Sequence, residues 1–250
     1  MNPATVIRTL VVAAMVLSLE LACRTGALPA TAVIPPSDMI RSMIEVLSSG
    51  ELAADMRQTF TAVAIAATVA ICGGFLVGFV IHMLPRARRA LDPLLGAYYA
   101  IPHVAFYPLL IVVFGLGMGP LIVLASLLGI VAMIIATIAG LDRVPRVLTR
   151  TARVHGLTPG QEMLLVRLPA ALPHLLSGVK LAFSYAFIGV IAGEFILSTA
   201  GVGHAIAYAY DNFDNQRMYG LILFIIGFVV VVNTSILFWE RRMVARRGNR

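Results

Sequence analysis

The sequence predicts an all-α polytopic membrane protein with about six transmembrane helices. Hydrophobic residues make up 60% of the chain and charged residues only 12%, with a mean hydropathy of +0.93, whereas a soluble domain is about 25% charged. The charges are also segregated, because the 49 residues between Asp92 and Asp142 include no Asp, Glu, Lys or Arg. One crossing needs about 20 apolar residues, so this run alone has room for two.

The first predicted element is a span near residues 4–23. Arg8 and Glu20 bracket its short apolar core, which fits either a retained transmembrane helix or the apolar region of a secretory signal. Ala22-Cys23 resembles the end of a lipoprotein signal, but Glu20 stands where such signals carry an aliphatic residue. The later spans would also need a signal anchor. We therefore expect this segment to be retained.

A short amphipathic helix is predicted after Pro35-Pro36. Two interpretations fit it: a helix lying in the membrane interface, or a helix packed against the outer ends of the spans. Residues 1–56 therefore form a predicted N-terminal unit of one transmembrane helix and one external helix. The apolar residues that recur at helical spacing are Met39, Ile40, Met43, Ile44 and Leu47.

Residues 57–242 are predicted to form the core, with five spans, and residues 243–250 a basic tail. A glycine-rich stretch from Gly115 to Pro120 supplies a turn in the middle of the uncharged run. Gly74-x-x-x-Gly78 and Gly189-x-x-x-Gly193 place small residues where two helices can approach closely. The five spans lie between Arg57 and Pro85, near 94–115, near 119–141, within 170–198, and in the 22 uncharged residues between Arg217 and Glu240.

The arginines predict that both termini are cytoplasmic, because cytoplasmic loops retain positive charge during insertion. In this orientation the tail and the loops near 86–89 and 143–169 are inside. The formal net charge of +7 then reflects topology and anionic lipid headgroups, and no nucleic acid is expected as a partner. The arginines that fall outside are Arg24, Arg41, Arg57 and Arg217.

Residues 143–169 form a polar segment between two spans that carries helix signals of its own. Gly156 is predicted to break a first helix, and Thr158 to start a second one as its N-cap. Pro159 suits the first turn, and Gln161 stands at the capping-box position. Spacings of three, four and three align the arginines of the first helix along one side: Arg143, Arg146, Arg150 and Arg153.

The second helix is predicted to end at Pro169, and Pro173 to open the next span. The result is a predicted helical hairpin with one apolar side and one basic side. Such a hairpin fits two roles: a plug for a groove on a soluble partner, or an interfacial hairpin lying on the membrane surface. The residues alone leave both roles open.

The hairpin also carries a family resemblance. Gly156, nine residues and then Val166-Arg167-Leu168-Pro169 resemble the EAA motif of binding-protein-dependent ABC importer permeases. The resemblance covers roughly Ser37 to Arg242 and is closest to the nitrate, sulfonate, taurine and bicarbonate subfamily. One position departs from the motif, since Arg150 stands where many members carry a glutamate. Other stretches that carry the resemblance are Ser49-Gly50-Glu51-Leu52, Ile101-Pro102, Pro108-Leu109, Phe114-Gly115, Leu181 to Glu194 and Gly201-Val202-Gly203.

This resemblance implies a type I ABC importer permease fold and a non-catalytic, multi-pass subunit of a bacterial cytoplasmic (inner) membrane. It implies two cytoplasmic ABC ATPase subunits, a second permease copy and an external solute-binding protein as partners. ATP and Mg would be bound by the ATPases, not by this chain. The cargo would be a small anion of the nitrate, sulfonate, taurine or bicarbonate type, or a related small organic compound. The residues that would couple to the ATPases are Arg150, Ala152, Arg153, Gly156, Leu157, Thr158, Val166, Leu168 and Pro169.

No catalytic site, metal site or bound cofactor is expected. A phosphate-binding loop needs a lysine after a glycine-rich turn, and the only lysine, Lys180, lies inside a span. The five histidines are scattered without metal-ligand spacing. The alternative function is an ion-gradient-driven secondary transporter or channel, although the spans lack a carboxylate cluster for ion coupling. A membrane enzyme is a third class, for which no catalytic residues stand out.

Two ionisable residues fall within one predicted span, where a charge needs a partner or water. Lys180 fits either snorkelling to the cytoplasmic headgroups or a contact with the pore or a neighbouring span. Glu194 lies 14 residues further on, near the outer boundary, and cannot reach Lys180 along one helix. We expect both to make intramembrane polar contacts of a structural kind.

A candidate substrate path is predicted around Pro102 and Pro108, because each removes a helix hydrogen bond and opens a kink. Aromatic side chains near membrane boundaries are also common as interfacial belt residues, so both interpretations stay open. The side chains predicted to face the path are Tyr98, Tyr99, His103, Ser184 and Tyr185.

Overall fold

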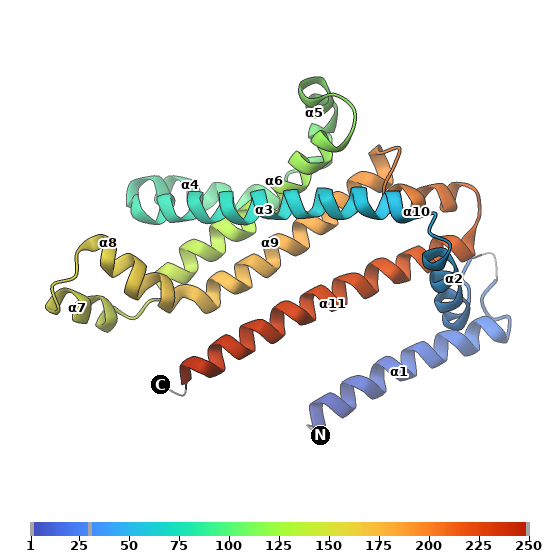
Figure 1. Ribbon diagram of the computed structural model, residues 1–250, viewed down its shortest axis with the longest axis horizontal. Coiled ribbons are helices and arrows are strands. Elements are labelled where there is room, and N and C mark those ends of the chain that lie inside the picture. The colour runs from blue at the N-terminus through green and yellow to red at the C-terminus, as the bar shows by residue number, and fades with distance from the viewer. Residues whose placement is uncertain (1–2, 30–31, 249–250) are drawn as a thin grey trace.

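The computed structural model describes residues 3–29 and 32–248, and every regular element among them is a helix (Figure 1). Five of these helices are long and apolar enough to cross a membrane, or six if one sharply bent pair counts as a single span. This agrees with the predicted class. The central three helices are α3 (Ala53–Met83), α6 (Met118–Asp142) and α9 (Leu168–Leu197), with α6 packed along both of the others.

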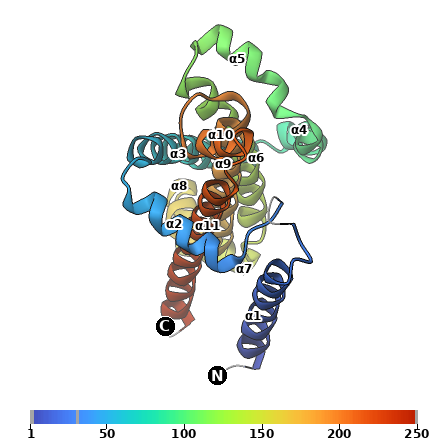
Figure 2. The same cartoon turned by 90° about the vertical axis from the view of Figure 1, so that its right-hand side faces the viewer.

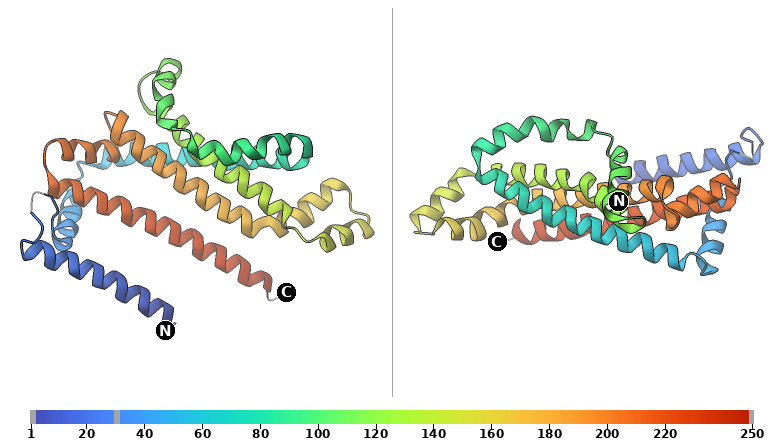
Figure 3. Two further views of the ribbon diagram at one scale, coloured as in Figure 1. Left: turned by 180° about the vertical axis from the view of Figure 1, so that it is seen from behind. Right: turned by 90° about the horizontal axis from the view of Figure 1, so that it is seen from above.

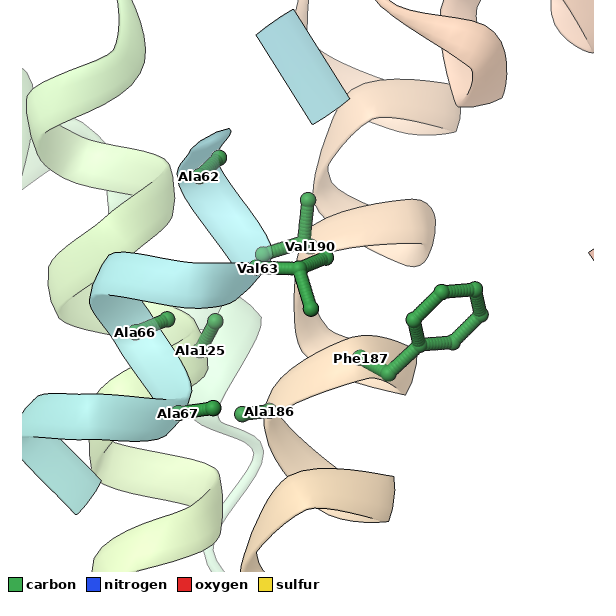
Figure 4. Close-up of a cluster of buried hydrophobic side chains, with 8 residues drawn as sticks. All are labelled: Ala62, Val63, Ala66, Ala67, Ala125, Ala186, Phe187 and Val190. Carbon is green, nitrogen blue, oxygen red and sulfur yellow. The ribbon is translucent and has the colours of Figure 1, made fainter. Parts of the chain in front are cut away.

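Small residues let the three central helices approach closely, as Figure 4 shows for one buried cluster. Lipid tails are as apolar as leucine, so helices in a bilayer associate largely through tight packing. A Cβ added at Gly74 would lie 2.6 Å from the carbonyl oxygen of Ile130, and one at Gly189 would lie 2.8 Å from Cα of Ala125. Both glycine pairs therefore lie at helix contacts, as predicted.

The N-terminal helix α1 (Pro3–Arg24) stands apart from the central helices (Figure 2). None of its most apolar stretch is buried within the chain. The polar end of α1 is tied to the helix that follows, because Glu20 pairs with Arg24 and accepts a hydrogen bond of 2.8 Å from the Ser37 hydroxyl. This first helix therefore depends on lipid or on another chain to cover its apolar surface.

The predicted amphipathic helix is α2 (Pro36–Ser48), which packs across the start of α11 (Asn215–Gly248). The Ser42 hydroxyl donates a hydrogen bond of 2.7 Å to the carbonyl of Gln216 and is only 7% exposed as a residue. Packing against the outer end of a span is therefore the better of the two interpretations. Ile40 and Ile44, on another face of α2, remain exposed.

The third span predicted near 94–115 is broken by a sharp bend, and the kink predicted at Pro102 is confirmed. The chain forms α4 (Pro85–Ala97), two short 3-10 turns and α5 (Tyr107–Phe114), and the two halves meet at 91°. The break falls at Ile101, whose ψ of 125° is extended, because a residue before proline disfavours the helical region. Pro108 causes no kink, since it sits in the first turn of α5, where no hydrogen bond is lost.

The two ends of the molecule differ (Figure 3). At one end, a hairpin of two short helices projects beyond the central helices, and the chain termini point toward this side. At the other end lie α2 and α10 (Val202–Asp211), a helix that was not predicted. The predicted boundary after 242 falls inside α11, which runs on to Gly248. The side chains of the basic tail 243–250 and the whole of residues 249–250 lie outside the described part, and the three-part division of the chain stays a prediction.

Candidate functional site

The projecting hairpin consists of α7 (Arg146–Val154), a glycine turn and α8 (Pro159–Glu162). Gly156 has a φ of +73°, a conformation that favours glycine. The N–H of Gly156 bonds the Arg153 carbonyl at 3.0 Å, and the N–H of Leu157 bonds the Ala152 carbonyl at 3.1 Å. These two bonds form a Schellman motif, the usual helix end with a left-handed glycine. Ala152 is only 4% exposed.

The first helix of the hairpin is shorter than predicted. The central helix α6 continues to Asp142, and Arg143 is its C-cap, not part of α7. Pro145 then acts as the N-cap of α7, because proline cannot continue a helix from the residues before it. The predicted stripe of four arginines is therefore wrong at Arg143, and three arginines remain on α7.

The second helix starts with the predicted capping box. The Thr158 hydroxyl accepts a hydrogen bond of 3.4 Å from the N–H of Gln161, and the Gln161 side chain accepts one of 2.9 Å from the N–H of Thr158. Two N–H groups that lack helical partners are thereby satisfied. The capping prediction is confirmed.

The end predicted for this second helix is wrong. Residues Met163–Arg167 form a π-helical turn, and α9 follows from Leu168 without a break. The N–H of Leu168 bonds the carbonyl of Met163, and this widened turn accommodates Pro169, which has no N–H of its own to donate. Pro173 lies inside α9 and does not open it. The hairpin and the span are one continuous helical element.

A buried carboxylate holds the hairpin together. Glu162 is 5% exposed and pairs with Arg167 at 2.6 Å and with Arg153 at 3.4 Å. The triad joins α7, α8 and the π turn. Sequence reasoning missed it, although a signal was present: Glu162 is the only acidic residue among the many arginines of 143–169.

The outer surface of the hairpin is apolar and basic. On α7, Val147 and Val154 are 70% and 86% exposed, and Arg150 lies between them on the same side. Leu164 and Leu165 are also exposed on the second arm. Val166 and Leu168, by contrast, are half-buried, and Leu168 packs on the core cluster at this end of the central helices.

The residues predicted for a substrate path come together in part. The Tyr99 ring stacks on the Tyr185 ring of α9, with centroids 5.3 Å apart. The Tyr98 ring contacts the His103 ring at 4.6 Å, and Tyr98 also donates a hydrogen bond of 3.0 Å to the carbonyl of Leu127. Ser184 is half-buried beside Tyr185. The cluster sits at the bend between α4 and α5, and its role in transport stays a prediction.

The two intramembrane ionisable residues have different surroundings. Lys180 is half-buried on α9 and forms no ion pair among the residues described. Glu194 is fully buried and accepts hydrogen bonds from the Thr59 hydroxyl of α3 and from the N–H of Gly203 at 3.0 Å. Within the described part of the chain, no three His, Cys, Asp or Glu residues lie close enough to hold a metal ion.

Comparison with known proteins places the chain in a family. Residues 70–249 match the family described as binding-protein-dependent transport system inner membrane component. The taurine transport system permease protein TauC of Escherichia coli is 28% identical over 180 residues, which cover 70% of this chain and 66% of that protein. The nitrate import permease protein NrtB of Synechococcus elongatus is 28% identical over 187 residues, which cover 73% and 66%.

Solved structures agree on the fold. The MetNI methionine ABC transporter in an inward-facing conformation includes a chain that matches with a TM-score of 0.64 at 20% identity, covering 76% of this chain and 94% of that chain. The fold thus follows the architecture of type I ABC importer permeases. The chain belongs to the family of binding-protein-dependent transport system inner membrane components.

Proposed function

We propose that this chain is the permease subunit of an ATP-driven importer and forms the translocation path for a small solute delivered by an external binding protein. ATP is hydrolysed by two separate cytoplasmic ABC ATPase subunits. The assignments of two relatives to taurine and nitrate transport support a small sulfonate-like or nitrate-like anion as cargo. The subunit lies in the bacterial inner membrane with both termini in the cytoplasm.

The projecting hairpin is the observation that carries this proposal. Its Schellman turn, capping box and Glu162 triad stabilise the hairpin from within, although it extends beyond the central helices. A hairpin lying on a membrane would separate its apolar and basic side chains onto opposite faces. On α7, the exposed side chains of Val147 and Val154 lie next to Arg150, at the border of the arginine side. This mixed surface suits an apolar groove with acidic flanks on a soluble ATPase.

A second copy of the chain completes the path in this proposal. On α9, a strip of side chains at helical spacing faces away from α3 and α6, with Leu181 50% and Ile188 58% exposed. Ser177 and Ser184 lie on the same strip. The strip fits a path shared with a second permease copy.

The test is a comparison of two glycines in the hairpin. Gly156 requires its left-handed backbone, whereas Gly160 does not, and a Cβ on either would meet no atom within 4 Å. Gly156→Asp is expected to lower both copurification with the cognate ATPase and stimulation of its activity at least tenfold. Gly160→Ala is expected to leave both unchanged. An intact complex with Gly156→Asp would overturn the coupling role.

Uptake in proteoliposomes separates this proposal from the alternative class. The assembled complex is expected to accumulate solute only with internal ATP and added binding protein. Accumulation by this chain alone, driven by an ion gradient without ATP, would instead identify a secondary transporter. The two results exclude one another.

A further inference from the structure

Four aromatic side chains meet at the bend between α4 and α5 (Figure 1). The Tyr98 ring contacts the His103 ring on one side and meets the Tyr99 ring edge to face at 6.0 Å on the other. The Tyr99 ring in turn stacks on that of Tyr185 in α9. We call these four residues the bend cluster. Its rings form one continuous row from the bend to α9.

The bend cluster lies at mid-depth of the spans. The Tyr98 hydroxyl donates its hydrogen bond to the carbonyl of Leu127, which is near the middle of α6. Tyr185 is likewise near the middle of α9. Aromatic belt residues, by contrast, lie at the two membrane boundaries. The belt interpretation of these tyrosines therefore does not fit their depth.

The buried member of the bend cluster, His103, has a nitrogen to which nothing is bonded. The residue is 5% exposed, and its Nε2 atom has no hydrogen-bond partner in the described part of the chain. The ring does bond the backbone of Ile101. A neutral imidazole carries one N–H, so donating it to a backbone carbonyl leaves a lone pair on Nε2. A buried acceptor without a donor costs free energy, which favours any state in which a donor reaches it.

Basic side chains are absent from the part of the sequence that forms the bend. The residues between Asp92 and Asp142, which include three of the four members of the bend cluster, contain no Lys or Arg. On α9, Lys180 comes five residues before Tyr185 and therefore lies about 140° away around the helix. Proteins bind anions largely through Arg and Lys. A bare anion such as nitrate thus finds no basic side chain in the bend cluster.

The bend cluster instead suits a positively charged donor. Aromatic rings are partly negative on their faces and attract an ammonium group that lies within about 6 Å of the ring centre. Tyr99 is 41% exposed and offers such a ring. The lone pair on Nε2 of His103 accepts a hydrogen bond from the same kind of group. Both features select a protonated amine.

We propose that the bend cluster is a transit site for the protonated amine of an organic cargo, with His103 as its hydrogen-bond acceptor. The inference rests on the proposed function, which supplies the path and a small anionic cargo. It narrows that cargo to anions that also carry an amine, of the aminosulfonate type. Nitrate and alkanesulfonates without an amine are disfavoured at this site. The amine reaches Nε2 when the bend moves during transport.

The first test is solute binding to the complex of this chain with its ATPases in nanodiscs, without binding protein. The probe is labelled taurine. Ethylamine, which has only the amine, is expected to displace it at concentrations at least tenfold lower than ethanesulfonate or nitrate, which have only the anion. Equal displacement by ethylamine and ethanesulfonate would overturn the inference. So would a wild-type complex that binds no taurine.

Variants of the bend test the role of the lone pair. His103→Phe removes the acceptor but retains a ring to pack on Tyr98, and it is expected to weaken taurine binding at least tenfold. His103→Gln retains a side-chain acceptor and is expected to keep part of the affinity. The matched control is Phe106→Leu, which trims a 41% exposed ring in the same short turn and is expected to bind taurine as the wild type does. Copurification with the ATPases checks that each complex forms. Wild-type affinity in His103→Phe would contradict the proposal.

Uptake distinguishes failure of this inference from failure of the proposed function. In proteoliposomes with internal ATP, one binding protein delivers taurine to the wild-type and the His103→Phe complexes, so a difference in rate arises in the permease. The rate is expected to fall at least tenfold in the variant. ATP-dependent uptake at equal rates would overturn the transit site alone. A wild-type complex that neither stimulates its ATPases nor takes up solute with ATP would overturn the proposed function.

Discussion

The hydroxyl of Thr59 lies 2.8 Å from the carboxylate of Glu194, and the two residues are 135 positions apart in the chain. The same hydroxyl accepts a hydrogen bond of 2.8 Å from the N–H of Val202. One side chain of α3 thus satisfies both a buried carboxylate of α9 and the first turn of α10. A second carboxylate, Asp55, accepts a hydrogen bond of 2.7 Å from the N–H of Gly201 beside it.

Thr59→Val is expected to destabilise the protein. The isosteric side chain leaves the Val202 N–H without its acceptor and Glu194 without one donor, and each buried group left unsatisfied costs about 1–3 kcal/mol. The measurement is thermal unfolding in nanodiscs. Thr59→Ser retains the hydroxyl and is expected to unfold close to the wild-type temperature. Equal unfolding temperatures for Thr59→Val and the wild type would show that the network contributes nothing.

Two adjacent glycines of α3 are expected to respond differently to alanine. A Cβ at Gly74 would meet the Ile130 carbonyl oxygen at 2.6 Å, a backbone atom, whereas a Cβ at Gly73 would meet only the end of the Ile130 side chain at 3.4 Å. Gly74→Ala should therefore force α3 and α6 apart and cost about 1–3 kcal/mol of unfolding free energy. Gly73→Ala should be nearly neutral. Denaturation of the two variants in the same detergent measures the difference, and equal losses would contradict the packing described.

The two arginines of the hairpin triad are expected to matter unequally. The Arg167 side chain is 27% exposed and lies 2.6 Å from Glu162, whereas that of Arg153 is 71% exposed and lies 3.4 Å away. Exposed ion pairs contribute little, while removing the partner of a buried charge is costly. Arg167→Ala should therefore lower ATPase stimulation and thermal stability more than Arg153→Ala. The reverse order would mean that Arg153 has a direct contact with the ATPase.

The stacked rings of Tyr99 and Tyr185 are expected to be energetically coupled. Aromatic pairs in this geometry contribute about 0.5–1.5 kcal/mol beyond the area they bury. A double-mutant cycle with Tyr99→Leu and Tyr185→Leu should show a coupling of this size in unfolding free energy. If the pair also lines the path, transport rates should show coupling as well. If the effects of the two substitutions are additive in both measurements, the contact between the two rings contributes no coupling energy.

The spans and the hairpin could be predicted because their signals are local. The 49 uncharged residues between Asp92 and Asp142 predict two apolar passages, and α6 fills the second of them. Thr158, Pro159 and Gln161 specify a helix start through bonds that close within four residues. Such signals do not depend on the rest of the fold.

The features that the sequence did not predict depend on contacts between distant segments, or arise where one sequence signal is compatible with two local structures. Pro102 indicated a kink, but not a bend of 91°, because the run is as apolar as a straight span and hydropathy does not show how far the chain turns. Pro169 suggested a helix end, but a π turn supplied a second way to accommodate a proline. Glu194 could be recognised as needing a partner, yet nothing near it in the chain pointed to Thr59.

The continuity of the π turn with α9 has a mechanical consequence. Leu168–Leu197 spans 30 residues, which at 1.5 Å per residue makes a rod of about 45 Å. The hairpin is attached to one end of this helix. Near the other end of the helix, Glu194 accepts a hydrogen bond from the N–H of Gly203 in the first turn of α10. A tilt of about 5° at the hairpin would displace the far end by about 4 Å at this length. A movement of the hairpin is thus expected to reach the start of α10 through one continuous helix.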